Sequence, residues 1–575
     1  MLEPIDRTTE QSLFEEIDPD ELRRHVDAFT GLERSSGSDD EWEASEYIID
    51  TLSEYGVDAT LHEYEGYISV PDAASLEVTT PTTRSIEDVI TVSFSASTPA
   101  GGVHGEVVLV EEFDESIVES RDLEGKIAFT RDTPKPHTVS LVERAGATAL
   151  ICQSPNEYCY QGIVTPVWGT PSTDTAEDIP DLPVVETNKP NGEWLADQLE
   201  YGPVEATVRT EVTTELTTLP CPVGQIDGVD SDRYFVVGNH VDSWFEGITD
   251  NATAMAATLE IARIYADRES SRGLVFGFWS AHSTGRYAGS SWYADDNWLD
   301  LRDNGVAYLH IDLPGLKGAD SLWYQHMAEL ADEHFDAMQT ATNLELREQE
   351  ESYLGATGRP ARNSDQSFWG TGLSSLLSGG RLTPETDEGG PVGGGWWWHT
   401  PEDTRDKVDL DVLVEETKLY LAMTARLCES PILPHDYTAT VEDIRRNLDE
   451  IETAADGAMS FDDVKADLDR LESALEEFVE KIKGQDVESE GPAIEDLQVQ
   501  LGNILNPALY MEAPDYEHEP RRPYRQLPYL RVAETLPELT GRERRFAETK
   551  VQRGRVKLAH RVQRATAVTR RFLDE

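Results

Sequence analysis

The stretch Tyr234-Phe235-Val236-Val237-Gly238 leads directly into Asn239-His240-Val241-Asp242, and this junction decides the fold. A continuous apolar run is typical of a strand that is buried on both faces of a parallel sheet. The imidazole and carboxylate that follow it would stand at the carboxyl end of that strand, where open α/β sheets bind ligands. The sequence therefore predicts an α/β unit with a site at this edge of the sheet.

Two further apolar runs and an apolar helix extend the same pattern. The runs are Leu274 to Phe278 and Val306 to Leu309, and the helix is expected from Thr253 to Tyr265. Alternation of strands and helices over residues 216–430 is typical of a mostly parallel, mixed sheet flanked by helices. Residues 1–66 are expected to complete this unit with two helices and a strand that runs from Val57 to Glu65.

The chain changes character on both sides of residues 216–430. Residues 67–215 hold short β-branched runs between Pro, Gly and Asp turns, which predicts an inserted β-rich domain. Residues 431–575 are helical, and apolar residues between Val464 and Ile482 recur at spacings of four and three. This seam is expected to pack within the chain or across a dimer.

The segment from Arg542 to Arg571 is locally basic. Nucleic acid is one partner for such a segment. We favour a helix that pairs with acidic surface of its own chain or of a sister subunit.

The chain as a whole is strongly acidic. Its 575 residues include 111 Asp and Glu against 48 Lys and Arg, which gives a formal net charge of −63. Acids spread along a folded chain indicate adaptation to high salt, because the Debye length falls to about 3 Å at 1 M and self-repulsion costs little there. An ordinary acidic cytosolic protein is the alternative. We expect no nucleic-acid partner, because phosphate binding needs clustered Lys and Arg.

The cysteines, the first residues and the lengths of the apolar runs all bear on where the protein is located. The cysteines at 152, 159, 221 and 428 form no CxxC pair and no disulfide framework. The start, Met1 to Asp6, has neither a basic nor an apolar signal region. No stretch approaches about 18 uninterrupted apolar residues. We therefore expect a cytoplasmic protein with no membrane partner.

Residues with metal-ligating side chains follow strands and loops of the α/β unit. His240 and Asp312 come after buried strands, Asp250 precedes a helix, and His399 follows the glycine- and tryptophan-rich loop Gly393 to Trp398. Imidazole with carboxylate suits zinc, and a pair of metal ions needs a carboxylate between them. One such residue alone is usually a cap or turn residue, so the prediction rests on all of them in this order.

The segments around these residues resemble the co-catalytic zinc peptidases, which include bacterial aminopeptidases, glutamate carboxypeptidase II and the transferrin receptor. The segments are Asn239-His240-Val241-Asp242-Ser243, Ile248-Thr249-Asp250-Asn251-Ala252, Leu309-His310-Ile311-Asp312, Asn363-Ser364-Asp365-Gln366-Ser367-Phe368 and His399-Thr400-Pro401-Glu402-Asp403-Thr404. The inserted domain resembles a protease-associated domain through Leu123 to Ile127 and Ala145 to Ala149. The helical end resembles that subfamily's dimerisation domain through Asn506 to Tyr510.

The resemblance implies a role for each residue. His240 and Asp312 would hold one Zn²⁺ ion, Asp250 would bridge, and His399 would hold a second ion. Asp242 would orient His240 and set its tautomer. The implied reaction is hydrolysis of an amide bond in a small peptide or an N-acylated amino acid, by a homodimer joined through the helical domain.

The chain departs from the family at His282 and Ser283, which stand where the resemblance expects two adjacent glutamates. Three interpretations remain open. In the first, His282 replaces the general base, since a neutral imidazole can accept a proton from water. In the second, His282 ligates the second metal and a different base serves. In the third, the site holds one metal or none, and the protein is a non-catalytic binding or scaffold relative, as the transferrin receptor is.

Two more features border this segment. Arg286 has the planar donor geometry that binds a substrate carboxylate, and an ion pair at the surface or at a helix end is the alternative. Trp396 to Trp398 either line a substrate pocket beside His399 or pack under the glycine loop.

Overall fold

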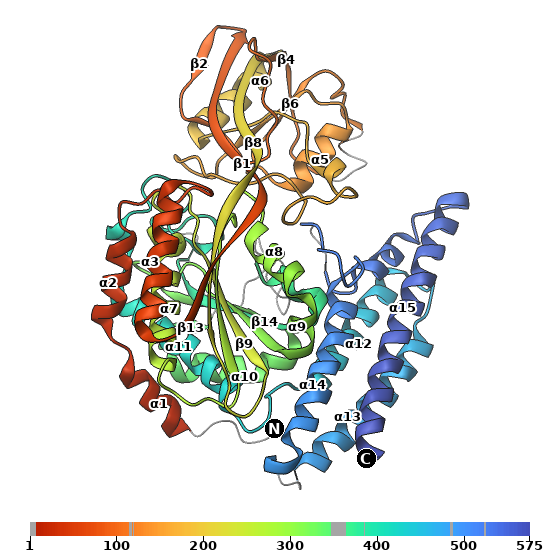
Figure 1. The fold of residues 1–575 in the computed structure, drawn as a ribbon. Helices are drawn as coiled ribbons and strands as arrows, with labels where there is room; N and C mark the ends of the chain where they lie inside the picture. Colours follow the sequence, from red (N-terminus) through yellow and green to blue (C-terminus); the bar gives the residue numbers. More distant parts are fainter. Residues whose placement is uncertain are drawn as a thin grey trace.

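The computed structural model describes residues 7–113, 118, 120–346, 364–383, 386–483, 487–521 and 525–574. A mixed sheet forms the centre of the α/β unit (Figure 1). Its parallel strands lie in the order β14 (Ser374–Arg381), β11 (Gly305–His310), β9 (Tyr234–His240) and β10 (Gly273–Trp279). Beyond β14, β12 (Ser321–His326) pairs antiparallel and β13 (Glu345–Leu346) pairs parallel with β12. Every residue of β9, β10 and β11 is buried, as their apolar runs predict.

Helices cover both faces of this sheet. One face packs against α1 (Arg7–Glu16), α2 (Pro19–Phe29), α3 (Asp39–Tyr55), α7 (Thr253–Tyr265), α10 (Ala331–Ala341) and α11 (Leu410–Cys428). The opposite face carries α8 (Ala288–Asp296) and α9 (Trp298–Asn304). The side chain of Asp18 accepts a hydrogen bond from the N–H of Asp20 and caps α2, and Gly56 ends α3 with φ 86°. The predicted α/β architecture is confirmed.

Two long strands join the α/β unit to the inserted unit (Figure 1). They are β1 (Asp58–Thr80) and β8 (Glu205–Ile226), which pair antiparallel along their whole lengths. Both strands continue from one unit into the other, so residues 66/67 and 215/216 lie inside them. The strand expected at Val57 to Glu65 is longer than predicted. Its partner β8 is rich in Thr and Val from Thr207 to Thr218, with no Gly or Pro to end it.

The inserted unit has a small sheet of its own. Parallel neighbours β4 (Val103–Leu109), β5 (Ile127–Thr130), β6 (Ala149–Gln153) and β7 (Val184–Thr187) form its centre. The antiparallel strands β3 (Val89–Thr91) and β2 (Arg84–Ile86) pair with β7 and β1. Helices α5 (Pro136–Arg144) and α6 (Lys189–Tyr201) pack against it. Its identity as a protease-associated domain stays a prediction.

The C-terminal region is a bundle of long helices beside the α/β unit (Figure 1). The helices are α12 (Tyr437–Ala454), α13 (Asp462–Ile482), α14 (Val487–Tyr510) and α15 (Gly541–Asp574). The predicted apolar seam lies on α13 and is buried within the chain. The basic helix α15 forms ion pairs with acids of α13, from Arg555 to Asp463 at 2.6 Å and from Arg570 to Glu477. Its acidic partners therefore lie in the same chain.

None of the described helices combines the length and the apolar character that crossing a membrane requires.

Candidate metal centre

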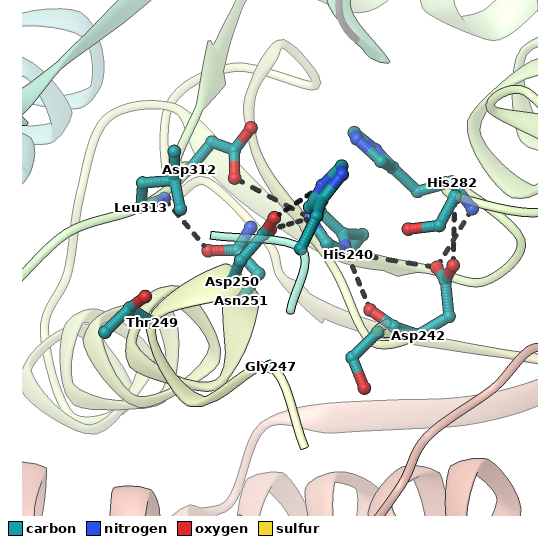
Figure 2. A network of polar contacts seen from close by, with 12 residues as sticks. His240, Asp242, Gly247, Thr249, Asp250, Asn251, His282, Asp312 and Leu313 are labelled. Carbon is teal, nitrogen blue, oxygen red and sulfur yellow. Dashed lines mark hydrogen bonds and ion pairs between the residues drawn. The ribbon is translucent and has the colours of Figure 1, made fainter. Parts of the chain in front are cut away.

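Asp250 lies next to His240 at the carboxyl edge of the central sheet (Figure 2). Its Oδ1 is 3.0 Å from Nε2 of His240, and its Oδ2 is 3.0 Å from Nε2 of His399. Asp312 adds a second carboxylate, with Oδ1 3.6 Å from Nε2 of His240. The structure thus brings together the four side chains that the sequence singled out.

Local structure explains why these residues meet. His240 ends β9 and Asp312 follows β11, and these two strands are parallel neighbours that end at the same edge. Asp250 lies in the turn Ile248–Ala252, directly before α7. His399 comes from a loop of the chain beyond β14 and adopts φ 56°.

Main-chain carbonyls orient both imidazoles. Nδ1 of His240 donates to the carbonyl of Asp242 at 2.8 Å, and Nδ1 of His399 donates to the carbonyl of Gln161 at 2.6 Å. Because a carbonyl only accepts, each Nδ1 carries the proton and each Nε2 is left to face Asp250. This is the tautomer that a metal ligand needs.

The carboxylate of Asp242 has a different task from the one expected. It lies 3.9 Å from Nδ1 of His240. The hydrogen-bond partner of that Nδ1 is instead the main-chain carbonyl of Asp242. The carboxylate oxygens accept the main-chain N–H groups of His282 and Ser283, each at 2.9 Å, and the hydroxyl of Ser36 at 3.2 Å. Asp242 therefore orients His240 through its backbone and holds the His282 segment through its side chain.

Asp403 holds the turn that carries Asp250. Its Oδ1 accepts the N–H of Thr249 at 3.0 Å and the hydroxyl of Thr249 at 2.8 Å, and its Oδ2 accepts the N–H of Asp250 at 3.2 Å. Burial raises the pKa of Asp403 to about 7, and the charge of Asp250 acts in the same direction.

Arg34 supports the same turn from the N-terminal side. Its buried guanidinium donates to the carbonyls of Val241, Glu246 and Gly247 at 2.8, 2.8 and 3.0 Å. The loop between His240 and Asp250 is therefore held from within the protein, and the two side chains keep their separation.

His282 stacks on His240. The ring centroids are 3.9 Å apart and the ring planes 17° apart. The ligating atoms of His240, His282 and Asp312 lie within 4.8 Å of one another. Among the described residues, none forms a hydrogen bond with the buried Nδ1 of His282. Burial and the neighbouring charge of His240 lower the pKa of His282 well below its usual value.

The electrostatics of the cluster favour a bound cation. Burial alone would lower the pKa of His240, but its contacts with Asp250 and Asp312 raise that pKa well above its usual value. Burial opposes ionisation of both carboxyl groups, yet hydrogen bonding to the histidines lowers their pKa values. Two buried carboxylates thus need positive charge close by, and a divalent cation supplies more of it than one proton does. The donor set fits a metal ion.

The comparisons agree with this geometry. Residues 223–424 match the model of peptidase family M28. We call this matched segment the M28 segment. It contains the two histidines, Asp250, Asp312 and the His282 segment.

Two of the similar proteins are peptidases by name. Aminopeptidase NAALADL1 of Mus musculus is 31% identical over 132 residues, which are 22% of this chain and 17% of that protein. Probable glutamate carboxypeptidase AMP1 of Arabidopsis thaliana is 23% identical over 332 residues, which are 46% of this chain and 47% of that protein. The matches therefore span less than half the length of these relatives.

A solved structure shares the fold of much of the chain. The aminopeptidase from Aneurinibacillus sp. strain AM-1 superposes with a TM-score of 0.57 at 20% identity, covering 73% of this chain and 96% of that one. At this identity the likeness shows the fold.

A cavity of about 710 Å³ opens beside the cluster in the M28 segment. Asp250, His282, Asp312 and His399 lie at one part of its wall, and the inserted unit supplies another part. Trp396 and Trp398 line the cavity, whereas Trp397 is buried and donates to Oγ1 of Thr249 at 3.2 Å. Trp396 and Trp398 thus border the cavity and Trp397 packs inside the protein, whereas the binding of substrate in this cavity stays a prediction.

Arg286 also lines this cavity. It is buried, and its Nη2 donates to the carbonyl of Ile163 in the inserted unit at 2.6 Å. The guanidinium therefore lies inside the molecule at the wall of the cavity and not at the surface.

Other contributors were not predicted from the sequence. They are Gln161, Asp403, Arg34, Arg381, whose Nη2 donates to the carbonyl of Asp312 at 3.1 Å, and His310, whose Nε2 lies 3.4 Å from Oδ2 of Asp312. Asp403 and His310 stand inside segments that resemble the family, so their positions carried a signal. Asn363, in the segment expected near the substrate pocket, lies outside the described residues.

Proposed function

We propose that this chain is a metal-dependent hydrolase that cleaves amide bonds of small peptides or N-acylated amino acids. One observation carries the proposal: the two oxygens of Asp250 each face the Nε2 of a different histidine, His240 and His399, at 3.0 Å beside a cavity. This is the arrangement in which one carboxylate can bridge two metal ions.

The residues divide into two metal positions. His240 and Asp312 would hold the first ion with one oxygen of Asp250, and His399 would hold the second with the other oxygen. Zinc suits this set of imidazole and carboxylate donors. The second position has fewer protein donors, since Ser283 offers only a hydroxyl where the resemblance expects a carboxylate, so it should bind its ion more weakly. A bound zinc ion polarises a substrate carbonyl and lowers the pKa of coordinated water.

We assign the proton-accepting role to His282. Nitrogen lone pairs lie in the plane of the imidazole ring, and the rings of His240 and His282 lie face to face. Their lone pairs therefore point side by side and not toward one ion, which favours proton transfer over ligation. With its donor atom within 4.8 Å of those of His240 and Asp312, His282 is in reach of a water molecule in the site.

Arg286 is proposed to bind a carboxylate of the substrate. Arg286 lies at the cavity wall, where its Nη2 donates to the carbonyl of Ile163 and its planar guanidinium borders the pocket. Changing Arg286 to Lys should raise KM about tenfold or more for a peptide with a free carboxylate. The corresponding peptide amide is the control substrate, and an equal effect on both would contradict the assignment.

The proposal is tested by metal content and turnover. Protein purified in high salt should carry zinc, hydrolyse members of a panel of dipeptides and N-acyl amino acids, and lose this activity with a chelator. The Asp250→Asn variant should lose both metal and activity. The competing function is a non-catalytic binding or scaffold protein, which the substitution at Ser283 favours. A metal-free protein with no turnover across the panel would establish that alternative.

The assembly is part of the proposal. We propose a homodimer joined through the C-terminal helices, supported by the resemblance and by the exposed apolar side chains of Phe546 and Val556 on α15. Sedimentation analysis of the wild type and of a Phe546→Glu/Val556→Glu variant tests it. A monomeric wild type overturns it.

A further inference from the structure

One residue of the inserted unit, Gln161, contacts the proposed metal ligand His399 directly. Its main-chain N–H donates to the carbonyl of His399 at 3.2 Å, and its main-chain carbonyl accepts Nδ1–H of the same histidine at 2.6 Å. One residue of the insert thus holds both the backbone and the ring of His399. The contact joins residues that are 238 positions apart in the chain.

Two neighbours of Gln161 anchor this contact. The hydroxyl of Tyr160 donates to the carbonyl of Trp396 at 3.1 Å. The ring of Tyr158 stacks on that of Trp396 with centroids 4.6 Å apart. Tyr158, Tyr160 and Gln161 therefore all contact residues 396–399, the segment that carries His399. We name residues 158–161 the docking loop.

The two histidines of the site differ in the origin of their orientation. The partner of Nδ1 in His240 is the carbonyl of Asp242, two residues away at the end of the same strand. His399 has the stacked ring of Trp398 beside it, at 3.4 Å between centroids, but stacking does not select between its two tautomers. Its Nδ1 partner comes from the inserted unit. The α/β unit alone therefore orients one of the two ligands.

We propose that Gln161 is a positioning residue of the metal centre, through which docking of the inserted unit sets the tautomer and direction of His399. The inference rests on the proposed function for the metal itself. The docked insert prepares the second metal position, whereas the first position is prepared within the α/β unit. An insert that is displaced from residues 396–399 leaves His399 free to exchange tautomers and weakens the second position selectively.

The experiment compares full-length variants of the docking loop. Tyr158→Ala/Tyr160→Phe removes the two anchors, and Gln161→Pro removes the N–H donor to His399. Gln161→Ala is the matched control, because it keeps both main-chain groups and removes only the side chain. His399→Ala identifies the imidazole signals of His399. The readouts are ¹⁵N imidazole shifts of ¹⁵N-histidine-labelled, metal-free protein and the zinc affinity of each position by competition with a chelator.

Loss of docking should leave the imidazole of His399 without its hydrogen-bond partner at Nδ1. In the double variant and in Gln161→Pro, the ¹⁵N shift of Nδ1 in His399 should move away from that of a fully protonated, hydrogen-bonded nitrogen. The weaker zinc affinity should fall about 10- to 100-fold, the usual effect of losing such an orienting partner, while the tighter one is unchanged. Gln161→Ala should behave as wild type.

Unchanged ¹⁵N shifts in the double variant would overturn the inference. The double variant decides if Gln161→Pro does not fold. The shifts are measured without metal or substrate, so a failure of the proposed hydrolase function would leave this test standing.

Discussion

Asp242 contacts both residues whose imidazole rings stack at the site, His240 and His282. Its carboxylate accepts the main-chain N–H of His282 at 2.9 Å, and its carbonyl oxygen accepts Nδ1–H of His240 at 2.8 Å. The side chain also takes the N–H of Ser283 at 2.9 Å. The relative position of the two rings therefore depends on one residue with two acceptor groups.

Replacing Asp242 with Asn tests this dependence. The amide keeps the size of the side chain but turns one oxygen into an NH₂ group, which faces the N–H of His282 or of Ser283 and cannot accept it. The carbonyl contact with His240 remains. We expect kcat to fall about 10- to 100-fold with little change in KM, as for the loss of other supporting contacts around a metal site. Steady-state kinetics with metal in excess measure this.

The matched control is Ser36→Ala, which removes the hydroxyl contact to Asp242 at 3.2 Å and leaves both N–H contacts in place. It should stay close to wild type. Full turnover in Asp242→Asn would show that the His282 segment keeps its position without the carboxylate.

Kinetics and metal content, measured together, distinguish a general base from a metal ligand at His282. His282→Ala should lower kcat by about 10²-fold or more, the usual effect of losing a general base, while the zinc content stays at the wild-type value. Ser283→Ala is the control on the same segment and should retain most activity. If the zinc content falls with kcat, His282 is a ligand. Unchanged turnover with full metal would remove it from the mechanism.

How far the sequence could predict this site depends on the kind of contact. His240, Asp250, Asp312 and His399 were predictable because each lies at a recognisable place: after a strand, before a helix or after a glycine loop. The contacts of Gln161 were not, because a main-chain carbonyl has no residue signature and its partner lies 238 positions away.

The contacts of Arg34 and of His282 show the same limit. Arg34 reaches the carbonyl of Val241 across 207 positions, and nothing in its local sequence marks a buried arginine. The substitution at His282 was visible in the sequence, but its stacking on His240 depends on the packing of two strands. Local sequence patterns predicted the metal-ligating residues. The contacts that hold these residues in place depend on tertiary packing, which the local sequence does not show.

Salt should stabilise the protein. A net charge of −63 repels itself, and raising NaCl from 0.1 to 2 M shortens the Debye length from about 10 Å to about 2 Å. Surface ion pairs such as that between Arg555 and Asp463 weaken in the same range, but each contributes about 1 kcal/mol or less. We therefore expect Tm to rise with salt, most steeply below 1 M. Thermal unfolding in a NaCl series measures this, and a flat or falling Tm would contradict adaptation to high salt.

Glu186 should make the stability of the inserted unit fall as pH rises. It is buried on β7, and its Oε1 accepts the N–H of Tyr160, in the docking loop, at 2.7 Å. Burial raises the pKa of Glu186 from 4.5 to about 8, and the charge of Asp132 acts in the same direction. The folded state therefore holds the proton more tightly than the unfolded state. The stability that this supplies is complete below about pH 4.5 and is lost as pH rises to about 8, at most about 5 kcal/mol in total.

The substitution Glu186→Gln removes this titration and keeps an oxygen that can accept the N–H of Tyr160. Between pH 5 and pH 9 the free energy of unfolding should therefore fall less steeply in the variant than in the wild type, with the largest difference at pH 9. Urea unfolding in 2 M NaCl at pH 5, 7 and 9 measures the two slopes. Glu157→Gln, an exposed acid in the same region, is the matched control and should leave the slope unchanged. Equal slopes in Glu186→Gln and wild type would mean that the buried carboxyl ionises without cost, and that its contact with Tyr160 or with water already stabilises the charged form.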